Sequence, residues 1–265
     1  MIPKIIHYCW FGRNPLTEEA KACITSWRRY CPDYKIMEWN ESNFDVMKND
    51  YCREAYEAKK WAFVSDYARL CVVYEHGGIY MDTDVEVVRP LDSLLNHKAF
   101  MGFENDRSVS IGTFGAEKKN SVVGDFFSIY DTRHFRQPDG SFDMMTNLRL
   151  VTKFLVQQHG LKLNGKKQEL EGGVTIYPME AFIAKDYRTG WILRDESTYV
   201  IHHYASSWVD ETLRRREDVY RQYLRTYIRA VEPILSKYAR TRMLYELDGV
   251  SGVLKMIKNY IKRIL

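Results

Sequence analysis

The alternation of apolar and polar positions along the chain predicts an α/β fold. Residues 4–10 form a short apolar run that ends in a Gly-Arg-Asn-Pro turn, which is typical of a strand and its exit. A second apolar run covers residues 34–39, and helical spacing fills residues 17–30 between the two runs, with Thr17 as the N-cap. Helical segments at 43–74 and a strand at 79–82 follow. This βαβα order predicts a mixed sheet with a parallel core.

The alternation continues less regularly as far as residue 204. It predicts strands at 99–104, 111–115, 172–178 and 199–204, and helices at 121–131 and 151–159. From Glu211 onward, charged helical segments replace it. We therefore expect residues 1–210 to form one α/β domain and residues 211–265 to form a helical C-terminal extension.

The helix that precedes the strand at 79–82 contains a charged pair. Its apolar positions fall at helical spacing, Ser65 is expected to cap its start, and Gly77-Gly78 is expected to end it. Asp66 and Arg69 are three residues apart and therefore share one face of this helix. They form either an ordinary surface ion pair, which would contribute little to stability, or a pair directed at the residues that follow.

Those residues are Asp82-Thr83-Asp84, which begin at the last residue of the predicted strand. Side chains two positions apart on an extended segment point the same way, so both carboxylates can reach one cation. Carboxylate oxygens suit Mn²⁺ or Mg²⁺, and such an ion keeps coordination positions for substrate phosphates. An isolated Asp-x-Asp is also common in solvated turns. A metal site is favoured at Asp82-Thr83-Asp84 because a helix, a Gly-Gly pair and a strand lead into this motif.

Trp10 lies at the end of the first predicted strand. Ligands of open α/β sheets bind beyond the carboxyl ends of the strands, so Trp10 and the two aspartates belong at the same edge. Its ring can stack on a flat base, although a buried tryptophan at a strand end is an equally ordinary arrangement. His7, inside the same strand, is expected to be a core histidine.

Three segments carry a resemblance to a known family. They are Ser65–Arg69 with Gly77–Asp84, the opening Ile5–Gly12, and the late Ile201–Trp208. Together they resemble glycosyltransferase family 32, which includes capsular polysaccharide transferases and fungal mannosyltransferases and is related to the glucosylating domain of clostridial toxins. The matches occur in the family's order and bracket about the first 210 residues, while residues 105–171 match only loosely.

The resemblance implies a GT-A-type nucleotide-diphospho-sugar transferase fold with a mixed central sheet. It implies a metal-dependent hexosyltransferase that retains the anomeric configuration, with a UDP-sugar as the favoured donor. Asp66 and Arg69 would contact the donor sugar and, with Asp84, serve catalysis. The nucleotide and its metal would be held by Trp10, Tyr80, Asp82 and Trp208, although Tyr80 could instead simply fill the core. Since no carboxylate stands out as a nucleophile for double displacement, front-side substitution is what the resemblance implies.

Two aspartates leave the coordination of the cation incomplete, so a third protein ligand is expected. His202 and His203 point to opposite faces of the last predicted strand, so only one of them can face the metal. The resemblance to a His-aromatic pair in related transferases favours His203. Ser206, Ser207 and Trp208 are further candidates, and Glu104 and Asn105 are placed on the acceptor side.

Composition agrees with an enzyme and bears on its location. The chain has 265 residues, a net charge of +4 and five cysteines without metal-site spacing. Neither an apolar run long enough to span a membrane nor a signal-peptide pattern is evident, so we expect a cytoplasmic protein, or a peripheral one on the cytosolic face of a membrane. The family resemblance, and not the composition, implies that the acceptor is a glycan or lipid-linked saccharide in surface polysaccharide (capsule) synthesis. Alternatives are a protein-modifying transferase and a catalytically silent sugar-nucleotide-binding protein, and we expect no nucleic-acid partner.

The C-terminal segment 253–265 is amphipathic. Its apolar residues fall on one helical face, with most of its lysines off that face. This pattern is typical of a helix that lies on an anionic membrane surface, and equally of a helix that docks on its own domain.

Overall fold

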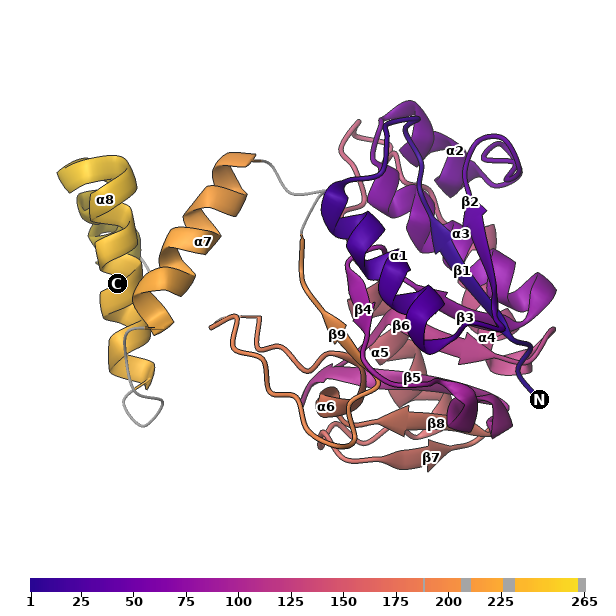
Figure 1. Ribbon diagram of the computed structural model, residues 1–265. Helices are drawn as coiled ribbons and strands as arrows, with labels where there is room; N and C mark the ends of the chain where they lie inside the picture. Colours follow the sequence, from indigo (N-terminus) through magenta and orange to yellow (C-terminus); the bar gives the residue numbers. More distant parts are fainter. Residues whose placement is uncertain (188, 206–210, 226–231, 262–265) are drawn as a thin grey trace. The chain divides into compact units, whose positions relative to one another are not determined.

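The computed structural model describes residues 1–187, 189–205, 211–225 and 232–261, which fall into two compact units. The larger unit comprises residues 1–185 and 193–204, and the smaller one comprises residues 186–192 together with the described part of 205–265. The domain boundary predicted near Glu211 stays a prediction. The elements of the larger unit, in chain order (Figure 1), are β1 (Ile5–Cys9), α1 (Glu18–Tyr30), β2 (Lys35–Trp39), α2 (Asp50–Glu57), α3 (Trp61–His76), β3 (Gly78–Met81), β4 (Val85–Val87), η1 (Asp92–Asn96), β5 (Ala99–Asn105), β6 (Ser108–Ala116), α4 (Ser121–Ser128), η2 (Ile129–Asp131), α5 (Asn147–His159), β7 (Gln168–Leu170), β8 (Val174–Tyr177), α6 (Met179–Phe182) and β9 (Val200–His202).

A mixed seven-stranded sheet forms the centre of the larger unit, in the order β2-β1-β3-β6-β5-β8-β7. β1 pairs in parallel with both β2 and β3, and β5 pairs in parallel with β8. The pairs β3–β6, β5–β6 and β7–β8 are antiparallel. The predicted mixed α/β sheet with a parallel part is therefore confirmed. β4 and β9 leave this sheet and form a separate antiparallel ribbon, which the sequence analysis did not predict.

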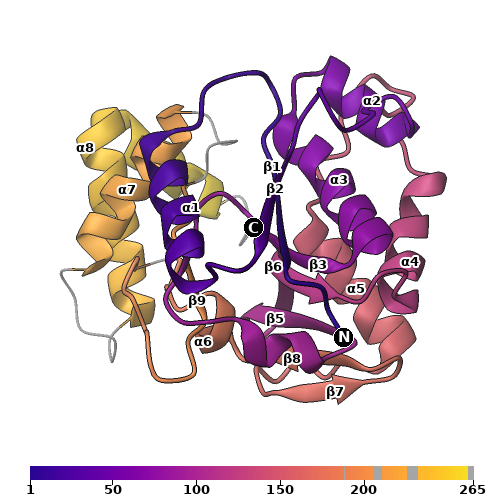
Figure 2. The same ribbon diagram turned by 45° about the vertical axis from the view of Figure 1, so that its right-hand side comes forward.

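Successive strand residues enter different cores because side chains alternate between the faces of a sheet. Ile79 and Met81 join a cluster with α1, η1 and α6, whereas Tyr80 between them joins the cluster with α2, α3, α4 and α5. Figure 2 shows α1 on one side of the strands and α2 and α3 on the other. The central strands are therefore buried on both faces, as parallel strands usually are.

The helix cap predicted at Thr17 and the helix end predicted at Gly77-Gly78 are both confirmed. The Thr17 hydroxyl accepts a hydrogen bond from Ala20 N at 3.2 Å and caps α1. Gly77 ends α3 with φ of +66°, and a Cβ there would lie 2.7 Å from the backbone nitrogen of Lys118, so only glycine fits. The expected cap at Ser65 is wrong. α3 begins at Trp61, so Ser65 lies inside the helix.

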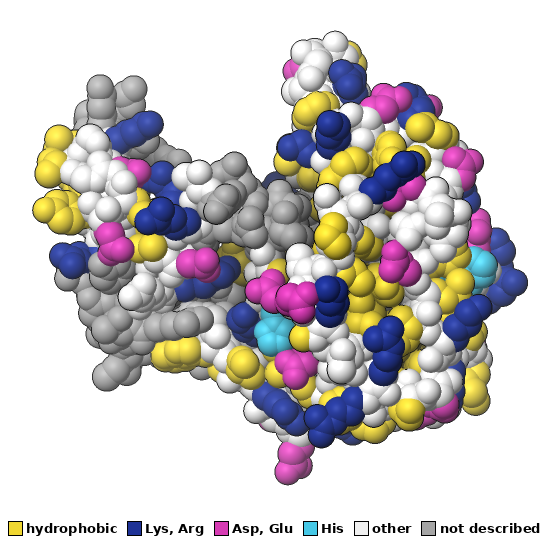
Figure 3. Space-filling model, turned by 45° about the horizontal axis from the view of Figure 1, so that its top comes forward, with side chains coloured by type: hydrophobic (Ala, Val, Ile, Leu, Met, Phe, Trp, Pro, Cys, Tyr) yellow, Lys and Arg dark blue, Asp and Glu magenta, His cyan; other side chains and the backbone are white. Residues whose placement is uncertain are grey.

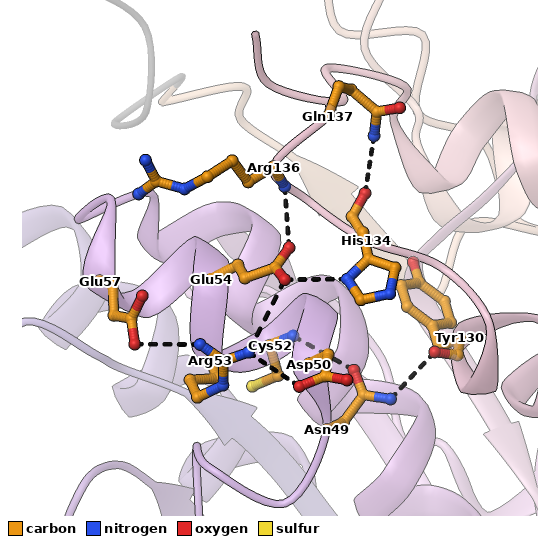
Figure 4. A network of polar contacts seen from close by, with 10 residues as sticks. All are labelled: Asn49, Asp50, Cys52, Arg53, Glu54, Glu57, Tyr130, His134, Arg136 and Gln137. Atoms are coloured by element: carbon orange, nitrogen blue, oxygen red, sulfur yellow. Dashed lines mark hydrogen bonds and ion pairs between the residues drawn. The ribbon is translucent and has the colours of Figure 1, made fainter. Parts of the chain in front are cut away.

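A polar network fastens the segment between η2 and α5 to α2 (Figure 4). Glu54 of α2 accepts a hydrogen bond from the backbone nitrogen of Arg136 at 2.9 Å, and its other carboxylate oxygen lies 2.8 Å from His134 Nδ1. Asn49 Nδ2 donates to the carbonyl of Tyr130 at 2.9 Å. Backbone groups of Tyr130 and Arg136 thus find partners on α2 and on its N-cap residue Asn49, which fixes the path of the chain towards α5.

The smaller unit contains two helices, α7 (Glu211–Arg225) and α8 (Glu232–Ile261). An ion pair joins Arg216 of α7 to Asp248 of α8, and α8 is kinked at Gly249. Tyr245, Val250, Leu254 and Ile257 are exposed apolar side chains on α8. No helix in the described residues is long and apolar enough to cross a membrane.

The larger unit exposes acidic and basic side chains side by side (Figure 3).

His7 is the core histidine that the sequence predicts. It is fully buried, Trp39 Nε1 donates to its Nδ1 at 3.0 Å, and its Nε2 lies 2.8 Å from the carbonyl oxygen of Gly77. The indole can only donate and the carbonyl can only accept, so the proton sits on Nε2 and the ring is neutral. Burial lowers the pKa of His7 to about 4, against the opposing hydrogen bond to Gly77.

This arrangement predicts a loss of stability at mildly acidic pH. The unfolded chain binds a proton near the ordinary pKa of 6.5, whereas the folded chain does so only near 4, so stability falls as the pH drops from 6.5 towards 4. We expect His7 to contribute about 2 kcal/mol to the loss between pH 7 and pH 5. Urea unfolding of the wild type and of His7→Gln at both pH values measures this. Equal losses in the two proteins would contradict the assignment.

Candidate functional site

Asp82 and Asp84 lie in the connection between β3 of the sheet and β4 of the ribbon. The backbone nitrogen of Val85 donates to the carbonyl of Asp82 at 3.1 Å, so these residues form a tight turn. The sequence analysis expected an extended segment with both side chains on one face. That local conformation is wrong, but the turn still brings the two carboxylates to one place.

The third member of the cluster comes from β9. β4 and β9 are antiparallel with Val85 opposite His202, which sets the His202 imidazole beside the aspartate turn. Its Nε2 lies 3.2 Å from Asp84 Oδ1. One ligand atom from each of Asp82, Asp84 and His202 can be chosen so that all three lie within 4.8 Å of one another.

His203, the histidine favoured from the sequence, points elsewhere. Its Nε2 lies 2.8 Å from Glu86 Oε2, and its backbone nitrogen donates to the carbonyl of Asp84 at 2.9 Å. The expectation that only one of the two histidines faces the aspartates is met. The choice between them was wrong because the register of the β4–β9 ribbon decides it, and that ribbon was not predicted.

The donor set fits a divalent cation. Two carboxylates and one imidazole are compatible with Mn²⁺, and the imidazole favours it over Mg²⁺. Burial lowers the pKa of His202, but the charge of Asp84 and its hydrogen bond, with the charges of Glu104 and Asp82, raise that pKa to about 9. His202 Nδ1 is buried and has no hydrogen-bond partner among the described residues. The carboxylates therefore produce a strong negative potential at His202. No described protein group holds the imidazole through its Nδ1.

Arg69 connects this cluster to α3. Its guanidinium lies 3.2 Å from Asp82 Oδ2 through Nη1 and 3.2 Å from Asp66 Oδ1 through Nη2. The carbonyls of Ser65 and Ile111 accept its remaining hydrogen bonds at 3.1 and 3.2 Å. Asp66 and Arg69 thus share a helix face as predicted. Arg69 is buried, Asp66 is half-buried, and the pair is directed at Asp82 rather than solvated on the surface.

Tyr80 orients the same carboxylate from the sheet. Its hydroxyl donates to Asp82 Oδ1 at 2.9 Å, and the Arg69 guanidinium lies 4.8 Å from its ring centroid. Tyr80 is only 1% exposed. Of the two roles that the sequence left open for Tyr80, a contact with the nucleotide and a place in the core, its burial favours the core. Its role in the site is to hold Asp82.

Asp66 is held by residues that the sequence analysis missed. Asn147, at the start of α5, donates through Nδ2 to the carbonyl of Asp66 at 2.9 Å, and the Tyr130 hydroxyl hydrogen-bonds to the same Asn147 side chain. Burial raises the pKa of the Asp66 carboxyl to about 6, against the lowering charge of Arg69. Asn147 lies 81 residues from Asp66 in sequence, so no local signal pointed to it.

Gly112 of β6 is a second missed residue. Its carbonyl accepts a hydrogen bond from the backbone nitrogen of Asp82 at 2.8 Å, and a Cβ at this position would lie 2.9 Å from Asp82 Oδ2. The glycine therefore leaves the space that the carboxylate occupies. It sits inside a strand, where the sequence gives no reason to single it out.

The remaining predicted residues surround the cluster or lie outside the described part of the chain. Trp10 follows β1, which is parallel to β3, so it sits at the same edge as the aspartates. It is half-buried, with Nε1 donating to the carbonyl of Asn14 at 2.7 Å. Its stacking on a base stays a prediction. Candidates that fall outside the described residues are Ser206, Ser207 and Trp208.

Glu104 lies close enough to the cluster to influence the charge of His202, and its place on the acceptor side stays a prediction. The Tyr204 hydroxyl donates to Glu104 Oε1 at 2.7 Å, and the Tyr204 ring stacks on His202 with centroids 4.4 Å apart. Tyr204 has a φ of +56°, an uncommon conformation for a tyrosine. Asn105, by contrast, accepts a hydrogen bond from the backbone nitrogen of Arg107 in the β5–β6 turn.

Comparison with known proteins bears on this arrangement. Residues 17–101, which include Asp66, Arg69, Asp82 and Asp84, match the family described as "Glycosyltransferase sugar-binding region containing DXD motif". This chain carries the sugar-binding DXD region of the glycosyltransferases. The resemblance to glycosyltransferase family 32 is thereby confirmed.

The curated relatives of this DXD-region protein include two mannosyltransferases of Schizosaccharomyces pombe. Inositol phosphoceramide mannosyltransferase 3 is 32% identical over 125 residues, which cover 44% of this chain and 34% of the relative. For inositol phosphoceramide mannosyltransferase 1 the identity is 29% over 123 residues, covering 40% and 37%. The human alpha-1,4-N-acetylglucosaminyltransferase is 31% identical over 90 residues, or 33% of this chain and 22% of that enzyme. The chain thus matches about a third of the length of these mannosyltransferases.

Solved structures with a similar backbone include two glycosyltransferases. PaToxG glycosyltransferase superposes with a TM-score of 0.47 at 18% identity and covers 59% of this chain and 69% of its own. An active-site mutant of LgtC gives a TM-score of 0.40 at 12% identity, covering 80% and 93%.

The geometry predicts that His202, and not His203, supports metal binding. Replacing His202 with Gln removes the imidazole beside Asp82 and Asp84 and should weaken Mn²⁺ binding at least about tenfold. His203→Gln is the matched control, since it removes the neighbouring imidazole, which contacts Glu86, and should bind Mn²⁺ like the wild type. Electron paramagnetic resonance of free Mn²⁺ measures both without requiring activity. Weaker binding in His203→Gln alone would contradict the structure.

Proposed function

We propose that this chain is a metal-dependent glycosyltransferase that moves a sugar from a nucleoside diphosphate sugar, with a UDP-sugar favoured, to a saccharide or lipid-linked saccharide. The observation that carries the proposal is the convergence of Asp82, Asp84 and His202, whose ligand atoms lie within 4.8 Å of one another. The matching DXD region supports the same class of reaction.

In the proposed reaction the bond between the anomeric carbon and the diphosphate oxygen breaks, and a bond to the acceptor oxygen forms. The acceptor proton passes to an oxygen of the departing diphosphate. A bound cation would supply positive charge against the negative charge that develops on this leaving group. Asp82, Asp84 and His202 would hold the cation, and Tyr80 and Arg69 fix the carboxylate of Asp82 before substrate arrives.

Asp66 is the better candidate for a direct sugar contact. One of its oxygens faces Arg69, and a carboxylate can accept further hydrogen bonds from sugar hydroxyls. Arg69 is buried, and protein acceptors surround its guanidinium. We therefore assign Arg69 to positioning Asp66 and Asp82, in place of the sugar contact expected from the sequence.

We infer that transfer retains the anomeric configuration by front-side substitution. The family resemblance supports this. Proton NMR of the first product formed from a donor of known anomeric configuration distinguishes retention from inversion. An inverted product would remove this part of the proposal.

The acceptor is proposed to be lipid-linked and the site of action the cytosolic face of a membrane, in surface polysaccharide synthesis. The names of two relatives specify a lipid, inositol phosphoceramide. The exposed apolar side chains of α8, including Leu254 and Ile257, are suited to a membrane surface. A protein acceptor is the alternative. A catalytically silent binding protein is disfavoured by the complete cluster of Asp82, Asp84 and His202.

The central test is Mn²⁺-dependent hydrolysis of a panel of nucleoside diphosphate sugars. Asp84→Asn should reduce turnover at least about a hundredfold, because the charge that balances the cation is lost. Glu86→Gln is the matched control: the same chemical change two residues away, at a carboxylate that contacts His203. It should retain wild-type turnover. Undiminished hydrolysis by Asp84→Asn, or no hydrolysis of any donor by the wild type, would contradict the proposal.

A second prediction concerns Asp66. Asp66→Asn keeps the shape of the side chain but removes its charge, so it should weaken binding of the sugar nucleotide about tenfold, as expected for a hydrogen bond to a charged group, while binding of the bare nucleoside diphosphate changes little. Isothermal titration with both ligands in the presence of Mn²⁺ gives the comparison. Equal losses would show that Asp66 does not contact the sugar.

A further inference from the structure

A groove on the larger unit, outside the site described above, carries positive charge on both walls. It runs between α5 and the β5–β6 turn and has a volume of about 350 Å³. Arg107 lies on the wall formed by the turn, and Arg149 and Lys153 lie on the wall formed by α5. Apolar side chains of Leu148, Val156 and Leu163 complete it.

The order of residues along α5 produces this surface. Asn147, Val151 and Leu155, spaced four apart, form the buried row. The next row, Leu148, Thr152 and Val156, faces the groove, and the row after that is Arg149, Lys153 and Gln157. An aliphatic stripe therefore runs beside a cationic stripe on the outer side of one helix.

The aliphatic side chains are unusually accessible. Val156 is 41% exposed and Leu163 is 46% exposed, and Met144 and Met145, just before α5, are exposed as well. Within the described part of the chain neither Arg149 nor Lys153 forms an ion pair. Their charges are therefore not neutralised by described protein groups.

The sequence around the groove is strongly biased in charge. Residues 144–168 contain no aspartate or glutamate, and their five cationic residues are Arg149, Lys153, Lys162, Lys166 and Lys167. The whole chain carries a net charge of only +4, so the positive charge is concentrated locally. Arg107 on the opposite wall has an exposed acidic neighbour, Asp106, whose Oδ1 lies 4.0 Å from Arg107 Nε.

We propose that this groove and the outer face of α5 form a docking surface for an anionic phospholipid bilayer. Lysine and arginine near a membrane surface are attracted to lipid phosphates, and exposed aliphatic side chains enter the interfacial layer. Nucleic acid would match the cations but not the exposed Val156 and Leu163. The surface lies entirely within the larger unit and does not involve α8, so it is a second membrane contact beyond the proposed function.

Vesicle flotation with the full chain tests the proposal. The wild type should bind vesicles of phosphatidylcholine mixed with phosphatidylglycerol, should not bind phosphatidylcholine alone, and should be released by high salt, which shortens the screening length below the ~8 Å of physiological conditions. The double variant Arg149→Glu/Lys153→Glu should bind at least about tenfold more weakly. The matched control, Arg28→Glu/Arg29→Glu on α1, makes the same change of charge on an exposed helix elsewhere and should bind like the wild type.

A position-specific probe gives a second readout. All five native cysteines are buried, so Leu163→Cys can be labelled selectively with an environment-sensitive fluorophore. Its emission should shift to shorter wavelength on anionic vesicles, whereas a label at Glu19→Cys on α1 should not respond.

Several outcomes would overturn the proposal. It fails if the wild type does not bind anionic vesicles, or if Arg149→Glu/Lys153→Glu binds them as well as the wild type does. It also fails if Leu254→Glu/Ile257→Glu on α8 abolishes binding while the α5 variant does not, or if the charge reversal weakens binding of RNA but not of vesicles. None of these results bears on Mn²⁺-dependent donor hydrolysis, so the proposed transferase chemistry stands or falls separately.

Discussion

The candidate site depends on one buried cation, the guanidinium of Arg69 between the carboxylates of Asp66 and Asp82. A charge in this position is costly unless every polar atom around it is satisfied. Two carboxylates and the carbonyls of Ser65 and Ile111 meet that condition. Because the partners come from α3, β6 and the end of β3, satisfying Arg69 also fixes how these elements meet.

The short connection between α3 and β3 positions the Arg69 guanidinium relative to the two carboxylates. α3 ends at Gly77, which only glycine can occupy, and β3 begins at the next residue, so Asp66, Arg69 and Asp82 are connected by a short and rigid path. The chain then leaves the sheet through the aspartate turn and enters the ribbon with β9. The ribbon returns a segment more than 100 residues later to the same turn, and it delivers His202 rather than His203.

The difference between what the sequence predicted and what it missed follows from the range of the interactions. The α3–Gly-Gly–β3 unit, the Thr17 cap and the Asp66–Arg69 pairing are set by residues a few positions apart, and all were predicted. The turn conformation at Asp82–Asp84, the choice of His202 and the contacts of Asn147 and Gly112 depend on tertiary pairing. Tyr80 shows the same limit, because its position before the aspartates suggested a ligand contact while the alternation of β3 buries it.

The charges of the cluster explain why a cation site belongs there. Asp82, Asp84 and Glu104 place their negative charges near His202, and Arg69 balances Asp82 together with Asp66. The negative field that remains around His202 raises its pKa to about 9, so at neutral pH a proton on His202 supplies the missing positive charge. A metal ligand must be neutral imidazole, so binding of a divalent ion would displace this proton while meeting the same electrostatic demand. The raised pKa and the proposed affinity for a cation are therefore two consequences of one arrangement of carboxylates.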